Sequence, residues 1–132
     1  MPITVAMYDK SYDHIRTRLD ALGLDITVRP FTKDGMFLIG GAVVPPRDVA
    51  VDYFWLSTHV SLDGVQAMAF DVARTCTSIG VLQTYNAGLD NPVYKEIARK
   101  GTRICNSSAQ AIAISEYTLA HVLSLVHPID LQ

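Results

Sequence analysis

The apolar positions along the chain follow two alternating periods. Short apolar or β-branched runs predict five strands, over residues 3–8, 25–30, 51–57, 80–85 and 102–105. The segments between most of these runs carry apolar residues at helical spacing. Strands that alternate with helices predict an α/β fold: a doubly wound parallel sheet of about five strands, in the flavodoxin-like order and with right-handed crossovers.

Capping and stop residues place the helices. The first follows Asp9 and ends at Gly23. In the second, Ser61 is the predicted N-cap. Its predicted core-facing residues are Leu62, Val65, Met68, Ala69 and Val72.

The later helices have equally clear signals. Asn91 and Pro92 begin the third helix, and Gly101 follows its basic last turn. A long apolar helix is predicted from about Ala109 to Val126. Residues 31–50 are too rich in glycine and proline for a crossover helix, so we expect a loop there with at most one short strand.

Length and charge narrow the possible partners. A chain of 132 residues predicts a single domain. The net charge is -2 and the eleven Lys and Arg residues are scattered, which argues against nucleic acid and anionic membrane as partners. The mean hydropathy of +0.21 is high. It is explained either by a well-filled core or by a surface for a partner subunit or a missing domain.

Cysteine and histidine usage argues against a metal site. Cys76 and Cys105 have no neighbour at metal-ligand spacing, and His14 and His59 are isolated in the sequence. The start of the chain lacks the pattern of a secretory signal. We therefore expect a cytoplasmic protein and no metal ligands.

The segment TYNAGLDNP, residues 84–92, is the first candidate site. In an open parallel sheet ligands bind beyond the carboxyl ends of the strands. Here Gly88 permits a tight turn, and the amides of Ala87 and Gly88 precede a helix whose positive end favours an anion. The alternative is a plain connection in which Asp90 or Asn91 caps the helix, and the local pattern alone favours it.

Two further features are ambiguous. Asn106, Ser107 and Ser108 precede the last helix, where such residues usually form caps and turns. Glu116 lies in that apolar helix, so its carboxylate must be paired, hydrogen-bonded or turned outward. His121, on the same helix, is interpreted as satisfied or exposed. The chain has no Gly-rich dinucleotide turn, phosphate loop or nucleophile elbow.

Residues 82–128 resemble the D-isomer-specific 2-hydroxyacid dehydrogenase family, in the later half of its substrate-binding (catalytic) domain. The shared order is a strand, a glycine turn, a helix ending in RKG, a strand, an Asn-led loop and an apolar helix with a Ser-Glu pair. The resemblance implies that the turn binds the substrate carboxylate. The implied substrate-binding residues are Asn86, Ala87, Gly88, Leu89 and Asn106, with Asp90 and Glu116 as supporting residues.

The chain also departs from the family pattern. Asn86 stands where the family has a first glycine, and Ser108 where it usually has a proline. The interval from Asn106 to Glu116 is one residue shorter than the commoner pattern, and His127 stands where an arginine often closes the helix. These differences bear on the identity of the substrate more than on the fold.

The nucleotide-binding domain of the family has no counterpart in the chain. In the family that domain supplies the turn for NAD or NADP and the catalytic arginine, glutamate and histidine. We therefore assign no catalytic or cofactor-binding residue and expect no cofactor for this chain alone.

The expectation is a substrate-binding domain truncated before the nucleotide-binding domain. The complete enzyme would be an NAD(P)-dependent oxidoreductase that acts on the CH-OH group of a 2-hydroxy acid, and the isolated chain would be inactive. Its expected partners are a small carboxylate substrate and, through the helix at 109–126, either a second copy or the missing domain. The alternative is a non-enzymatic flavodoxin-like module that dimerises or binds a small anion.

Overall fold

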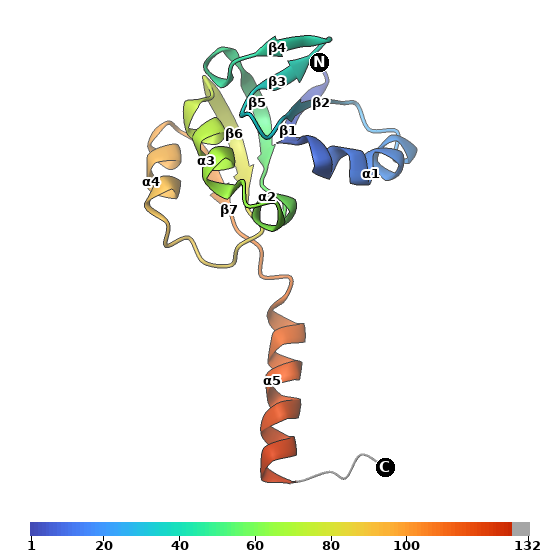
Figure 1. The fold of residues 1–132 in the computed structure, drawn as a ribbon, viewed down its shortest axis with the longest axis vertical. Helices are drawn as coiled ribbons and strands as arrows, with labels where there is room; N and C mark the ends of the chain where they lie inside the picture. The colour runs from blue at the N-terminus through green and yellow to red at the C-terminus, as the bar shows by residue number, and fades with distance from the viewer. Residues whose placement is uncertain (128–132) are drawn as a thin grey trace.

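A computed structural model describes residues 1–127, which form one mixed sheet covered by helices (Figure 1). The strands are β1 (Ile3–Tyr8), β2 (Ile26–Phe31), β3 (Phe37–Ile39), β4 (Ala42–Val44), β5 (Ala50–Trp55), β6 (Ser78–Gln83) and β7 (Arg103–Cys105). The α-helices are α1 (Asp9–Ala21), α2 (His59–Leu62), α3 (Gln66–Thr75), α4 (Pro92–Arg99) and α5 (Ala111–Val126). A short 3₁₀ helix, η1 (Pro46–Asp48), precedes β5.

The strand order is β4-β3-β2-β1-β5-β6-β7. The predicted α/β class is confirmed, and the five predicted strands pair in parallel. The expectation of a wholly parallel sheet is wrong, because β3 and β4 add an antiparallel hairpin beyond β2.

The hairpin lies in residues 31–50, where we expected a loop with at most one strand. Gly40 and Gly41 connect β3 to β4 and have φ values of 58° and 83°. Two consecutive residues with positive φ are typical of the type I′ turn, whose twist suits an antiparallel hairpin. The glycines that argued against regular structure therefore form the tight turn of the hairpin.

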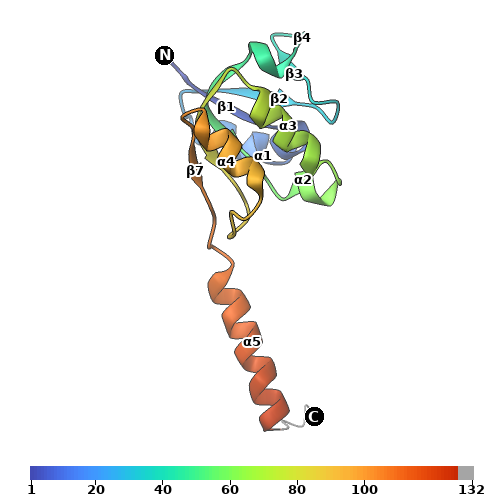
Figure 2. The same ribbon diagram turned by 90° about the vertical axis from the view of Figure 1, so that its left-hand side faces the viewer.

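One face of the sheet carries the core. Ala6, Phe54 and Leu82 lie side by side on neighbouring strands and are fully buried. They belong to one apolar cluster with Phe70 of α3 and Ile97 of α4. Figure 2 shows α3 and α4 together on this side, and Figure 1 shows α1 on the opposite side. The sheet is therefore covered on both faces, although unequally.

In the middle of β5 and β6 the alternation of buried and exposed side chains is interrupted. The buried residues Val51 and Phe54 are three positions apart, whereas a regular strand alternates its faces every residue. At this point the Asp52 carboxylate accepts hydrogen bonds from the Thr4 amide and hydroxyl, each at 2.8 Å. The Asp52 amide also donates to the Thr4 hydroxyl, at 3.0 Å. A Cβ on the adjacent Gly80 would lie 2.7 Å from the Asp52 carbonyl oxygen, so glycine is required there.

The predicted helix beginning at Ser61 is two helices. Gly64, with φ of 69°, separates α2 from α3 in the left-handed conformation typical of a residue that ends a helix. Ser61 therefore lies inside α2 and is not a cap, and Leu62 is 79% exposed, not buried. The core-facing predictions for Ala69 and Val72 are confirmed, since both are buried. Val65 and Met68 are partly buried against the core.

The last helix, α5, forms within two residues of its predicted start and extends away from the sheet (Figures 1 and 2). None of its residues is buried. Its large apolar side chains, 47–83% exposed, are Ile112, Ile114, Tyr117, Leu119, Val122, Leu123, Leu125 and Val126. Among residues 1–127 the structure contains no helix long and apolar enough to cross a membrane.

The close approach of Gly80 to Asp52 gives a stability prediction. We expect Gly80→Ala to lower the free energy of unfolding by about 1–3 kcal/mol, because the added methyl group has to displace the backbone of β5. Urea unfolding followed by circular dichroism measures the change. Ser78→Ala, on the same strand and exposed, is the control and should change stability by less than about 0.5 kcal/mol. Equal effects of the two substitutions would contradict the account.

Candidate functional site

The carboxyl ends of β1 and β5 meet where the direction of strand order reverses, which is the usual ligand site of such a sheet. Polar side chains from the end of β1, from α1 and from the segment after β5 pair with each other here. Tyr8 donates to the Asp63 carboxylate at 2.9 Å, and the Lys10 ammonium lies 2.7 Å from the same carboxylate. The buried hydroxyls of Ser11 and Ser57 also bond to each other. These contacts connect the end of β1 and the start of α1 to the residues on either side of α2.

The protonation of these groups follows from their pairing. The hydrogen bond from Lys10, followed by that from Tyr8, lowers the pKa of Asp63. Burial, followed by the bond to Asp63, raises the pKa of Tyr8 to about 12. Near neutral pH the pair is therefore a carboxylate that accepts from a protonated phenol and an ammonium group.

His14 and His59, which the sequence separates widely, are neighbours in the structure. Their rings, from α1 and α2, lie 5.4 Å apart between centroids, so the two side chains are isolated in the sequence but not in the fold. Within the described part of the chain, however, no three His, Cys, Asp or Glu side chains are grouped so as to hold a metal ion.

The turn after β6 is organised by a buried hydroxyl. Thr84 is fully buried, and its hydroxyl bonds to that of Tyr94, on α4, at 2.9 Å. The Asn86 amide donates to the Thr84 hydroxyl at 3.2 Å, and the Asn86 side chain donates to the Tyr94 hydroxyl at 3.3 Å. The first half of the turn is therefore held by three side chains and is not merely a flexible connection.

The loop after β7 is bonded directly to this turn. The Asn106 side chain donates to the Ala87 carbonyl at 2.7 Å, and the Ser107 amide donates to the Asn86 carbonyl at 3.2 Å. The Gln83 side chain donates to the Asn106 carbonyl at 3.2 Å. The structure thus brings Asn86, Ala87 and Asn106 together, as the sequence analysis grouped them.

A hollow of about 320 Å³ lies between these loops and the first turn of α5. Its mainly apolar wall includes Tyr85, Ala87, Ala111 and Ile114, and Ser107 and Ser115 supply hydroxyl groups. Tyr85 is held from the other side by Gln66 of α3, whose side chain donates to its hydroxyl at 2.8 Å. The contribution of Tyr85 and α5 was not predicted from the sequence, because their approach depends on how the two loops pack.

The second half of the turn presents its main chain to solvent. Within residues 1–127 the backbone amides of residues 87–90 donate no hydrogen bond to any acceptor. Gly88 does not have a positive φ, so the turn is made without a left-handed residue. A Cβ at Gly88 would instead lie 3.2 Å from the Asp90 carboxylate, which folds back towards the turn. The turn therefore combines unbonded amides with one nearby negative charge.

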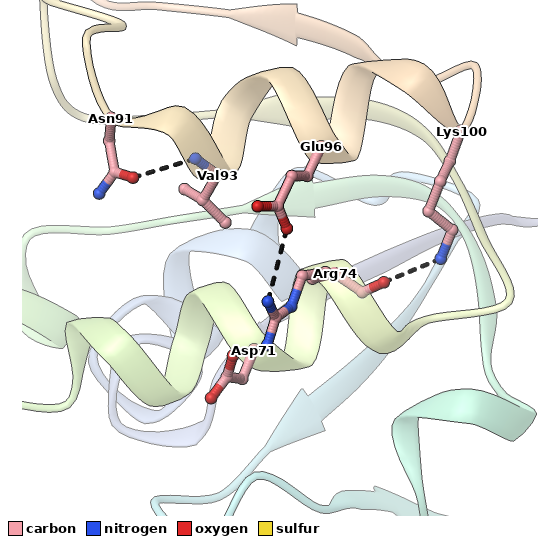
Figure 3. A network of polar contacts seen from close by, with 6 residues as sticks. All are labelled: Asp71, Arg74, Asn91, Val93, Glu96 and Lys100. Carbon is pink, nitrogen blue, oxygen red and sulfur yellow. Dashed lines mark hydrogen bonds and ion pairs between the residues drawn. The ribbon is translucent and has the colours of Figure 1, made fainter.

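The helix that follows the turn is anchored at both ends (Figure 3). The Asn91 side chain caps α4 by accepting from the Val93 amide at 3.0 Å, as predicted. At the other end, the Lys100 ammonium donates to the Arg74 carbonyl at 2.9 Å. Arg74 also lies 3.4 Å from Glu96. The contacts of Lys100 and Glu96 with Arg74 hold α4 against α3 and so help to fix the position of Tyr94.

The remaining predicted residues lie apart from the hollow. Gly88, Leu89 and Asp90 are exposed on the outer part of the turn. Glu116 is exposed on α5 and has no hydrogen bond or ion pair to any residue that the structure describes, so the outward-facing alternative holds for it. His121 is exposed too, with a ring nitrogen 2.9 Å from the Tyr117 carbonyl.

The hydroxyl network gives a second stability prediction. Tyr94→Phe removes the partner of Thr84 and Asn86 and leaves the buried Thr84 hydroxyl with fewer bonds. We expect the free energy of unfolding to fall by about 1–2 kcal/mol. Tyr117→Phe, an exposed site on α5, is the matched control and should change little. Equal losses for the two variants in urea unfolding would show that the network does not stabilise the turn.

The pair at the β1–β5 junction predicts a pH dependence. The pKa of Tyr8 is about 12 in the folded protein, against an ordinary value of 10.0. Its contribution to stability is therefore complete below pH 10 and is lost as the pH rises towards 12, because the unfolded chain releases the phenolic proton first. Urea unfolding across this range should show a shallower pH slope for Tyr8→Phe than for the original chain. An unchanged slope would refute the assignment, and Tyr117→Phe is the control that should keep it.

Comparison of the chain with descriptions of protein families, with curated proteins and with solved structures found no match. The resemblance to the 2-hydroxyacid dehydrogenases therefore rests on residues 82–128 alone. The last of these residues, Pro128, lies outside the part that the structure describes. The function has to be argued from the geometry of the two loops.

Proposed function

We propose that this chain is the substrate-binding domain of an NAD(P)-dependent oxidoreductase that acts on the CH-OH group of a 2-hydroxy acid. The observation that carries the proposal is the turn at residues 87–90, whose amides have no acceptor within residues 1–127. They precede the capped start of α4, and Ala87, the first of these residues, lines the hollow. Amides before a helix N-terminus favour an anion such as a carboxylate.

The two loops contribute to substrate binding in different ways. The amides of Ala87 and Gly88 hold the carboxylate, and the remaining part of the substrate lies against the apolar wall of the hollow. Asn106 acts indirectly, because its side chain is already bonded to the Ala87 carbonyl and so orients the turn. In the complete enzyme, C2 of the bound 2-hydroxy acid would then face the nicotinamide.

The hydride chemistry lies outside this chain. The sequence contains no Gly-rich dinucleotide turn, so its residues do not fit NAD or NADP. The cofactor and the catalytic arginine, glutamate and histidine belong to the nucleotide-binding domain of the complete enzyme. The order of the five parallel strands, β2-β1-β5-β6-β7, corresponds to the flavodoxin-like order and supports the proposed domain type.

A second candidate function is a non-enzymatic module that binds a small anion at the same turn and dimerises. The exposed apolar side chains of α5 favour this alternative, because contiguous apolar surface is typical of a contact with another protein. The two functions differ in what the hollow does. A substrate domain should discriminate among carboxylates, whereas a simple anion site should not.

Calorimetric titration with pyruvate, the smallest 2-oxo acid, tests the proposal. We expect binding to the chain, and we expect Asp90→Asn to increase the affinity about fivefold, since the carboxylate that faces the turn repels the ligand. Asp25→Asn, at the amino-terminal edge of the sheet, removes one charge elsewhere and serves as the control.

The outcomes separate the two functions. Acetate should bind more weakly than pyruvate if the hollow receives the rest of the substrate. Equal affinities would favour the anion-binding module. No measurable binding to the original chain or to Asp90→Asn would overturn both.

A further inference from the structure

One face of the sheet is only partly covered. Strand register places Val5, Tyr53, Val81 and Arg103 in one row across β1, β5, β6 and β7. Side chains one position along a strand point to the opposite face, so this row lies opposite the buried row that contains Phe54. Tyr53 is 46% exposed, whereas Phe54 is 0% exposed.

The next row on this face repeats the pattern. It contains Met7, Trp55, Gln83 and Cys105. Met7 is buried, but the other three are only partly covered. The helix on this side, α1, contacts β1 and β2 and leaves the part over β5, β6 and β7 open (Figure 1). We call this part, defined by Tyr53, Trp55, Val81 and Arg103, the open sheet face.

The helix α5 of the same chain has no sheet packed against it. Every residue of α5 is exposed, and its 16 residues span about 24 Å, roughly the length of the six-residue strands β5 and β6. A helix that is apolar on all sides needs a covering surface. The open sheet face and α5 therefore match in length and in apolar character.

The charges of the two surfaces are also complementary. Glu116 is the only Asp, Glu, Lys or Arg residue in α5. Arg103 is the charged member of the row that crosses the open sheet face, and it is exposed. Within residues 1–127 neither side chain has an ion-pair partner in its own chain.

The loop between β7 and α5 directs the helix away from its own sheet. The Ser107 amide bonds to the Asn86 carbonyl, and the Asn106 side chain bonds to the Ala87 carbonyl. Packing of α5 on its own open sheet face would require the chain to reverse within residues 108–110, the short segment between these bonds and the first turn of α5. A second copy can receive the helix without that reversal.

We propose that two copies of this chain exchange α5, so that the helix of each copy packs on the open sheet face of the other. The contact is reciprocal, as a two-fold symmetric dimer requires. Two such helix–sheet contacts bury area on the order of the 1,600 Å² typical of a stable interface. This dimer extends the proposed function, in that it gives the self-association expected of the chain a defined surface.

The first test is the mass of the purified 132-residue chain by light scattering. The exchange predicts twice the chain mass of 14.5 kDa. Tyr53→Lys, on the open sheet face, should weaken dimerisation about tenfold or more. Leu62→Lys replaces an exposed apolar residue of α2, away from this face, and should leave the dimer intact. A monomeric original chain, or equal effects of the two substitutions, would overturn the proposal.

The second test shows whether the contact lies within one chain or between two. Arg103→Glu and Glu116→Arg should each weaken the homodimer roughly tenfold, because both contacts then join like charges. In an equimolar mixture the two variants can form a heterodimer in which both contacts again join opposite charges. Its dissociation constant should return to within about twofold of the original. A mixture that associates no better than either variant alone would refute exchange between copies.

The pyruvate titration keeps this inference separate from the proposed function. Tyr53→Lys lies outside the two binding loops, so its monomer should bind pyruvate as the original chain does. Loss of dimerisation with retained binding supports both proposals. A chain that binds pyruvate but remains monomeric overturns the exchange alone.

Discussion

The hydrogen bond between the buried hydroxyls of Thr84 and Tyr94 is the constraint on which the candidate site depends. It joins the residue that follows β6 to α4, and Asn86 bonds to both partners. The position of Asn86 in turn fixes Ser107, and through it the loop after β7. A single buried pair thus sets the spacing of two loops whose sequences are 20 residues apart.

Much of the fold follows from local patterns in the sequence. The five parallel strands, the cap at Asn91 and the limits of α5 were predicted because each depends on residues close together in the chain. The hairpin at Gly40 was missed because paired glycines are equally compatible with a loop. The break at Gly64 was missed because apolar spacing continued across it. The phase change at Asp52 depends on Thr4, 48 residues away, and no periodic pattern reveals such a contact.

The candidate site was predictable in part. The grouping of Asn86, Ala87 and Asn106 came from a resemblance in the order of elements, and the structure places them in contact. The fold-back of the Asp90 carboxylate towards Gly88 was not foreseen, because it depends on the path of the whole turn. Tyr85 and the first turn of α5 were not foreseen as walls of the hollow, because their positions result from tertiary packing. The sequence thus indicated where an anion could bind, and the structure supplied the surface beside it.

Binding of a 2-oxo acid carboxylate by the amides of residues 87–90 is the step on which the proposed function rests. The most direct measurement is a titration of the ¹⁵N-labelled chain with pyruvate, followed by the backbone amide shifts. The account predicts that the largest changes occur at Ala87, Gly88 and the two residues after them, with smaller changes at Ser107. Changes centred on Tyr8 and Lys10, at the junction of β1 and β5, or no change at the turn, would contradict it.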